Sequence, residues 1–184
     1  MDADELLAYK VSARDSAQSE MLERFPHFLD HPIVVTEINE AAIDSYETWL
    51  NDEFDFGFER VIGWKRRPAH AKAIDIAVWC GDLLAGLCWA SPQDSPNKIL
   101  VLYLQRNPDD TLPTRGYIAP ICLTAVRNYA LLLDLKWVVI QDPNPDAREA
   151  YFREQFHQVP GIGLAYDLTN DYAALDEEVD DHER

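Results

Sequence analysis

Apolar and polar residues follow helical or strand periodicity along most of the chain. Residues 4–29 place leucine, valine, methionine and phenylalanine among polar residues and contain no glycine, which predicts one or two amphipathic helices. The β-branched run at 33–36 predicts a short strand, and Asn39 has the side chain to cap a helix directly after it. The apolar positions of that helix are Ile43, Tyr46, Trp49 and Leu50.

Three apolar runs in the middle of the chain predict three strands in succession, at 74–79, 83–89 and 99–105. The break at Gly81-Asp82 is short enough for a hairpin. Successive positions in these runs are apolar, so we expect helices to cover both faces of an antiparallel sheet.

The second half of the chain mixes helices and strands. Its spacing predicts a long central helix at 117–133, a buried strand at 137–140, a helix at 146–156 and a last strand at 163–168. The tail from Asp171 is dominated by acidic residues and is expected to fray. The order as a whole predicts an α/β (α+β) protein.

Length and composition indicate one principal domain. The chain has 184 residues, of which 47% are apolar, enough to bury one sizeable core. We therefore predict an N-terminal helical extension at 1–30, a domain at 31–170 and an acidic tail at 171–184. The extension either packs on the domain or contacts a second subunit, which leaves a homodimer open.

The charge balance restricts the partners. Asp and Glu number 33 against 16 Lys and Arg, for a net charge of −17, which disfavours nucleic acid. The same surplus either attracts cationic amines or serves solubility. One basic cluster suits an anionic group or a solvated loop, and no site is assigned to it; its members are Arg60, Lys65, Arg66, Arg67 and Lys72.

Cysteine content and the N-terminus point to the cytoplasm. The three cysteines Cys80, Cys88 and Cys122 lie in apolar runs, so we expect reduced core thiols, and no His or Cys stands at zinc-like spacing from them. The first residues are acidic where a secretory signal is basic, and no apolar run is long enough to span a membrane. We therefore expect no metal and no membrane insertion.

From about Ile33 to Leu168, the order of predicted elements resembles the GNAT superfamily of N-acetyltransferases. The matching order is a strand, a helix, three antiparallel strands, a loop with Arg-Gly, a long helix, a strand, a helix and a final strand. The resemblance implies a mixed, mostly antiparallel central sheet flanked by helices. The N-terminal helical extension and the acidic tail lie outside it.

The first matching motif is Arg115-Gly116-Tyr117-Ile118-Ala119, directly before the long helix. GNAT proteins typically carry a glycine-rich loop here, whose main-chain N–H groups hold the pyrophosphate of acetyl-coenzyme A (acetyl-CoA) at the positive end of the helix. The resemblance therefore implies that these five residues bind acetyl-CoA. A second glycine is usual where Ile118 or Ala119 stands, and a bulky side chain there is expected to narrow the cradle.

The second matching motif follows the strand at 137–140. Asn144 and Tyr151 match the family by type and spacing, whereas Gln155-Phe156 stands where Gly-Phe is usual. The resemblance implies that Asn144 contacts the pantetheine part of the cofactor and that Tyr151 protonates the departing thiolate, since a phenol is a proton donor at neutral pH. An aromatic residue packed on the sheet explains Tyr151 equally well.

The reaction implied by the resemblance is transfer of an acetyl group from acetyl-CoA to an amine of a small or peptidic acceptor. Pantetheine would pair with exposed main chain at Tyr103, Leu104 and Gln105, where an N–H group would also polarise the thioester carbonyl. No general base is singled out among the acidic residues on the acceptor side, which are Glu40, Glu53, Asp55 and Glu59.

Two functions from different classes remain open on the sequence. One is an N-acetyltransferase whose negative surface favours a cationic acceptor. The other is a catalytically inactive GNAT-fold protein that acts as a binding or regulatory module for a basic protein partner. The retained Arg115, Gly116, Asn144 and Tyr151 favour the first, and Ile118 in place of a glycine favours the second.

Overall fold

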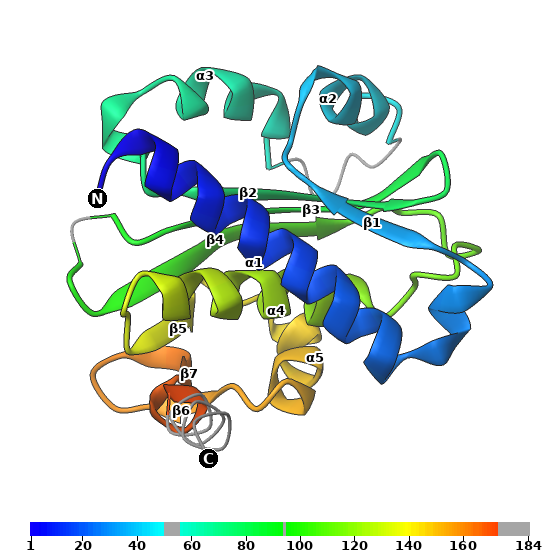
Figure 1. Cartoon of the computed structure of the whole chain (residues 1–184). Helices are drawn as coiled ribbons and strands as arrows, with labels where there is room; N and C mark the ends of the chain where they lie inside the picture. The colour runs from blue at the N-terminus through cyan, green and yellow to red at the C-terminus, as the bar shows by residue number, and fades with distance from the viewer. Residues whose placement is uncertain (50–55, 94, 173–184) are drawn as a thin grey trace, which may run out of the picture.

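A computed structural model describes residues 1–49, 56–93 and 95–172, and its strands form one sheet covered by helices (Figure 1). Seven strands are described, in the order β1-β2-β3-β4-β5-β7-β6, and neighbours are antiparallel except for the parallel pair β4 and β5. The strands are β1 (Ile33–Thr36), β2 (Ile74–Cys80), β3 (Leu83–Ser91), β4 (Lys98–Arg106), β5 (Trp137–Ile140), β6 (His157–Val159) and β7 (Gly163–Asp167).

Helices lie on both faces of the sheet, α2 and α3 on one face and α1, α4 and α5 on the other (Figure 1). Each face has its own cluster of buried apolar side chains. None of the described helices is long and apolar enough to cross a membrane. The helices are α1 (Ala3–Arg24), η1 (Pro26–Leu29), α2 (Glu40–Tyr46), η2 (Phe58–Arg60), α3 (Val61–Lys65), η3 (Pro68–His70), α4 (Ile118–Leu132), η4 (Pro145–Ala147) and α5 (Arg148–Arg153).

The predicted fold is confirmed, with two corrections near the C-terminal end. The helix expected to reach Phe156 ends at Arg153, because Gln155 adopts a positive φ of 65° and turns the chain back so that Phe156 enters the core. The strand β6 was not predicted, since its three residues have little apolar alternation. Of the predicted acidic tail, residues 173–184 lie outside the described residues, as does Leu50.

The N-terminal helix α1 is part of the folded body. It begins with a capping box between Asp2 and Glu5, and its buried face packs on α4 and β1. Arg14 forms a buried ion pair with Asp75 of β2, with 3.0 Å between Nη2 and Oδ1. The side chain of Gln18 accepts a hydrogen bond from the main-chain N–H of Val35 at 2.9 Å. The extension therefore packs within its own chain.

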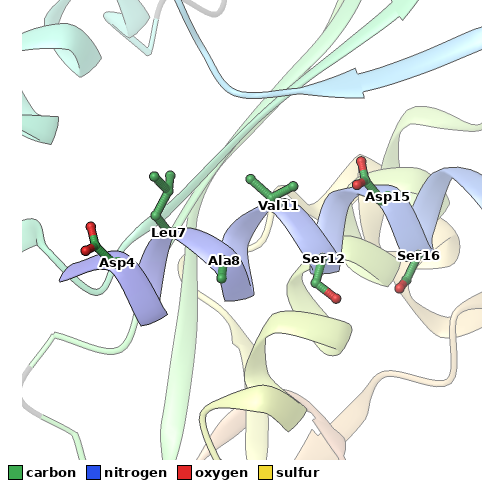
Figure 2. Close-up of a pocket in the computed structure, with 7 residues that line it drawn as sticks. All are labelled: Asp4, Leu7, Ala8, Val11, Ser12, Asp15 and Ser16. Carbon is green, nitrogen blue, oxygen red and sulfur yellow. The ribbon is translucent and has the colours of Figure 1, made fainter. Parts of the chain in front are cut away.

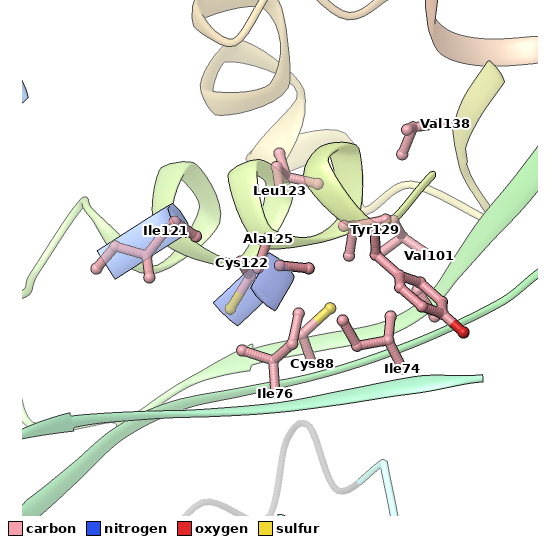
Figure 3. Close-up of a cluster of buried hydrophobic side chains, with 14 of the residues drawn as sticks. Ile74, Ile76, Cys88, Val101, Ile121, Cys122, Leu123, Ala125, Tyr129 and Val138 are labelled. Carbon is pink, nitrogen blue, oxygen red and sulfur yellow. The ribbon is translucent and has the colours of Figure 1, made fainter. Parts of the chain in front are cut away.

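The layer between α4 and the sheet is tightly filled (Figure 3). Ile121, Cys122 and Ala125 of α4 meet the strand residues Ile76 and Cys88 there, and all are buried. Close packing of this kind fixes the height of α4 above the sheet. It also fixes where the first turn of α4 stands relative to the end of β4.

Candidate functional site

The strands β4 and β5 separate partway along β4. Their parallel pairing runs from Lys98 and Trp137 to Val101 and Ile140, and one more hydrogen bond joins the Gln141 N–H to the Val101 oxygen at 3.0 Å. Beyond it the β5 chain turns away, whereas β4 continues to Arg106 and, among the described strands, pairs there with β3 alone. The result is a wedge in which no described strand covers the other edge of β4.

A β-bulge marks the point where the wedge opens. Tyr103 pairs with Trp89 and Val101 with Ala90, so Leu102 has no partner in β3. Leu102, Tyr103 and Leu104 are partly exposed, whereas β3, which has a neighbouring strand on each side, is buried from Leu84 to Ser91. Solvent therefore reaches β4 through the open edge.

From Tyr103 to Gln105, the side chains of β4 alternate between the two faces of the sheet. Leu104 packs with the cluster under α4, on the α4 face. Tyr103 lies on the opposite face, with its ring stacked at 5.6 Å from that of Trp64. Gln105 also points to the opposite face, where its side-chain oxygen accepts a hydrogen bond from Tyr46 at 3.4 Å. The three residues predicted from the sequence, Tyr103, Leu104 and Gln105, thus present side chains on both faces of the sheet beside the wedge.

The loop before α4 presents main-chain N–H groups at the positive end of the helix. The N–H groups of Arg115 and Tyr117 donate to turn carbonyls at 3.0 and 2.9 Å, whereas those of Gly116, Ile118 and Ala119 have no main-chain acceptor in the described part of the chain. Gly116 has a φ of 83°, and the space on its side-chain side is open. These groups can bind an anion such as a diphosphate.

The expectation that Ile118 narrows this cradle is wrong. The Ile118 side chain is only 3% exposed and points into the core against Gly86 of β3, where a Cβ atom would collide with it. The strand therefore needs glycine at position 86 to admit Ile118. Because the isoleucine side chain points inward, its N–H group remains accessible from the loop.

Two cations stand near the loop, and both share one carboxylate. Asp110 is 2.8 Å from Arg106 and 3.5 Å from Arg115, measured between Oδ1 and the nearest guanidinium nitrogen. All three side chains are about half-exposed, and ion pairs of this kind contribute little free energy. Either arginine can therefore turn from Asp110 to a bound phosphate at small cost.

Tyr151 is buried on α5 and lies close enough to the Cys88 and Cys122 thiols to interact with them electrostatically. Burial, followed by these two thiols, raises the pKa of Tyr151. A hydrogen bond with Cys122, together with burial, raises the pKa of Cys88, so this thiol is a poor nucleophile. Figure 3 shows Cys122 of α4 pointing toward Cys88 of β3, and Cys88 pairs with Leu104 of β4. The raised pKa keeps the Tyr151 phenol protonated at neutral pH, and its role as a proton donor stays a prediction.

Asn144 lies in the loop between β5, which ends at Ile140, and η4. Its side-chain oxygen accepts a hydrogen bond from the Asp146 N–H at 3.0 Å and caps the short helix η4. The residue is exposed, so its amide N–H₂ group can also reach a ligand. Contact with a cofactor stays a prediction for Asn144.

Of the four acids that the sequence places on the expected acceptor side, the two that the structure describes are exposed. Glu40 is exposed in the first turn of α2, and Glu59 is exposed beside Arg60 at 3.6 Å. Glu53 and Asp55 lie outside the described residues. Among His, Cys, Asp and Glu in the three described ranges, no group of three or more is arranged to hold a metal ion.

A shallow depression on α1 lies away from the wedge (Figure 2). Its lining comes from one helix alone: Asp4, Leu7, Ala8, Val11, Ser12, Asp15 and Ser16. Binding sites usually bring polar groups together from several elements. We therefore place the candidate site at the wedge.

The fold occurs in known N-acetyltransferases. The aminoglycoside 6'-N-acetyltransferase from Enterococcus faecium is 12% identical, with a TM-score of 0.52 over 68% of this chain and 86% of that one. The ribosomal-protein-S18-alanine N-acetyltransferase from Escherichia coli is 8% identical, with a TM-score of 0.51 over 69% and 79%. No protein-family model and no curated protein matches the sequence. The chain has the GNAT fold.

Proposed function

We propose that the protein is an N-acetyltransferase that moves an acetyl group from acetyl-CoA to an amine. The observation that carries this proposal is the wedge: β4 leaves β5 at Val101, and the N–H groups of Gly116, Ile118 and Ala119, which have no main-chain acceptor among the described residues, lie at the start of α4. An open strand edge can pair with the amides of pantetheine, and a helix start can hold its diphosphate.

The residues fit such a ligand. The space beside Gly116 is open, and the Ile118 side chain lies in the core. Bound acetyl-CoA would supply an activated thioester. Arg115 would face its phosphates, Asn144 would stand at the rim of the pantetheine site, and main-chain N–H groups at Tyr103 to Gln105 would polarise the thioester carbonyl. Tyr117 and Ala119 would complete the helix start.

In the proposed transfer, the acceptor nitrogen attacks the carbonyl carbon, a C–N bond forms and the C–S bond breaks. The amine proton leaves to a base or to water. The phenol of Tyr151 gives its proton to the departing thiolate. The raised pKa of Tyr151 keeps the phenol protonated until that step. The acceptor would approach from the opposite face, past Tyr103 and Trp64.

We further propose a small or peptidic acceptor that is cationic. The net charge of −17 steers cations toward the protein, and the exposed faces of aromatic rings attract an ammonium group. The half-exposed rings of Phe56, Trp64 and Tyr103 lie together on the acceptor side, within 5.8 Å of Tyr103. These rings suit an amine that carries its charge next to an apolar group.

One observation favours the alternative, a catalytically inactive GNAT-fold binding module for a basic protein. Asp110 shares its single negative charge between Arg106 and Arg115, and so weakens their attraction for a diphosphate without cancelling it. Calorimetric titration with acetyl-CoA separates the two functions. We expect micromolar binding and acetylation of a cationic amine; no detectable heat at high protein concentration would overturn the enzyme proposal.

Replacing Tyr151 by phenylalanine is expected to lower kcat about tenfold. General acids often contribute 10²–10⁴-fold, but a thiolate is already a good leaving group and needs less help. The ring still fills its place beside Phe156, so the calorimetric Kd for acetyl-CoA should stay within about twofold, since only the hydroxyl is removed. An unchanged kcat would make Tyr151 a packing residue.

A further inference from the structure

The helix that carries Tyr151 depends on a few anchors. With six residues, α5 is too short to be stable by itself. From Arg148 to Phe156, the buried side chains are those of Tyr151, Glu154 and Phe156, while Phe152 is 52% exposed. Two of these anchors are aromatic and one is a carboxylate. What holds Glu154 therefore fixes one of the three anchors of α5.

The partner of Glu154 comes from the N-terminal helix. Arg24, at the end of α1, donates from Nη1 and Nη2 to the two carboxylate oxygens of Glu154 at 2.7 and 2.8 Å. The Glu154 side chain is only 4% exposed and that of Arg24 is 43% exposed. A two-pronged pair between a planar guanidinium and a buried carboxylate fixes orientation as well as distance.

Glu154 is coupled directly to Tyr151. The main-chain N–H groups of Glu154 and Phe156 both donate to the Tyr151 carbonyl oxygen at 3.1 Å and close the end of α5. A shift of the Glu154 carboxylate therefore moves the turn from which the phenol projects. The next residue of the N-terminal segment, Phe25, meets the ring of Tyr117 at 4.8 Å, beside Gly116. The end of α1 thus contacts the turn that follows Tyr151, through Arg24, and the loop before α4, through Phe25.

We propose that Arg24 is a positioning residue: by holding Glu154, the N-terminal helix keeps the Tyr151 phenol aimed at the wedge beside Cys88. This inference rests on the acetyltransferase function proposed above. The proposal gives the N-terminal helix a role in the chemistry, although Arg24 lies 130 residues before Glu154 in the sequence.

A double-mutant cycle tests the proposal. Arg24→Ala is expected to lower kcat about fivefold and to leave the Kd for acetyl-CoA within about twofold. A fivefold effect is of the size usually found for coupling between residues of one ion-pair network. In the Tyr151→Phe background the same change should have no further effect on kcat, because Arg24 acts through the phenol. Arg24→Lys, which keeps the charge but not the planar fork, should restore part of the rate. An equal loss in both backgrounds would overturn the proposal.

Two more variants control for folding. Arg153→Ala removes an exposed pair with Glu149 on the same helix and should leave kcat unchanged. If Arg24→Ala fails to fold because Glu154 is left unpaired, the double variant Arg24→Ala/Glu154→Gln removes the buried charge as well and should show the same fivefold loss. A double variant with full kcat would contradict the role of Arg24.

A spectroscopic readout keeps this inference separate from the proposed function. Ultraviolet titration, with each spectrum taken as a difference from the matching Tyr151→Phe variant, isolates the ionisation of Tyr151. Loss of the Arg24 anchor should let water reach the phenol and move the Tyr151 pKa down toward its ordinary value of about 10. This holds whether or not the protein transfers acetyl groups. An unmoved pKa would overturn the positioning role even if transfer is never detected.

Discussion

Replacing Gly116 by glutamate is expected to weaken acetyl-CoA binding by at least about 1,000-fold. Gly116 stands at a φ of 83° with open space on its side-chain side, so a glutamate would project where the diphosphate is proposed to sit. Hydrogen bonds to charged groups contribute about 1.5–3 kcal/mol each, and loss of two of them with added charge repulsion gives about 4 kcal/mol. Calorimetric titration of both proteins measures the loss.

Gly81→Glu is the matched control. Gly81 lies in the turn between β2 and β3, has a φ of 58° and also faces open space. The substitution therefore adds the same charge and a similar backbone strain of about 1 kcal/mol away from the loop. We expect its affinity for acetyl-CoA to stay within about twofold of the unmodified protein. Retained binding in Gly116→Glu would place the diphosphate elsewhere.

Local patterns in the sequence were enough to predict six of the seven described strands and the main flanking helices. The strands β1 and β5 have the predicted bounds, and Asn39 caps α2 as expected, its side chain accepting from the Ala42 N–H at 3.0 Å. These elements are determined by residues within a few positions of each other. Alternation and capping are both visible at that range.

The parts of the site that depend on distant residues could not be predicted. Whether the Ile118 side chain faces the loop or the core depends on Gly86, more than 30 positions earlier. A glycine inside a strand can indicate that another group packs closely against the backbone there, but it does not say which group. The proximity of Tyr151 to Cys88 and Cys122 arises from three separate elements. The pairing of Arg24 with Glu154 has no local signature at all, because neither residue differs from a surface charge in its neighbourhood.

A buried ion cluster around Asp75 joins the N-terminal helix to the domain. The carboxylate accepts from Arg14 at 3.0 Å, from the Ile38 N–H at 2.7 Å and from Lys65 at 2.9 Å. Its side chain is 3% exposed and that of Arg14 is 7% exposed. Three segments, α1, α3 and the turn before α2, therefore meet on one carboxylate at the start of β2.

Asp75→Asn is expected to lower the free energy of unfolding by about 3–5 kcal/mol, because it leaves the Arg14 guanidinium buried without a counter-charge. That is a large share of the roughly 5–15 kcal/mol by which domains are stable, so the loss should be visible in urea unfolding followed by tryptophan fluorescence. Glu149→Gln, which removes an exposed carboxylate paired with Arg153, should change the same quantity by no more than about 0.5 kcal/mol. A cost below about 1 kcal/mol for Asp75→Asn would mean that apolar packing alone docks α1. The apolar face of α1, packed on α4 and β1, would then be what fixes the position of Arg24.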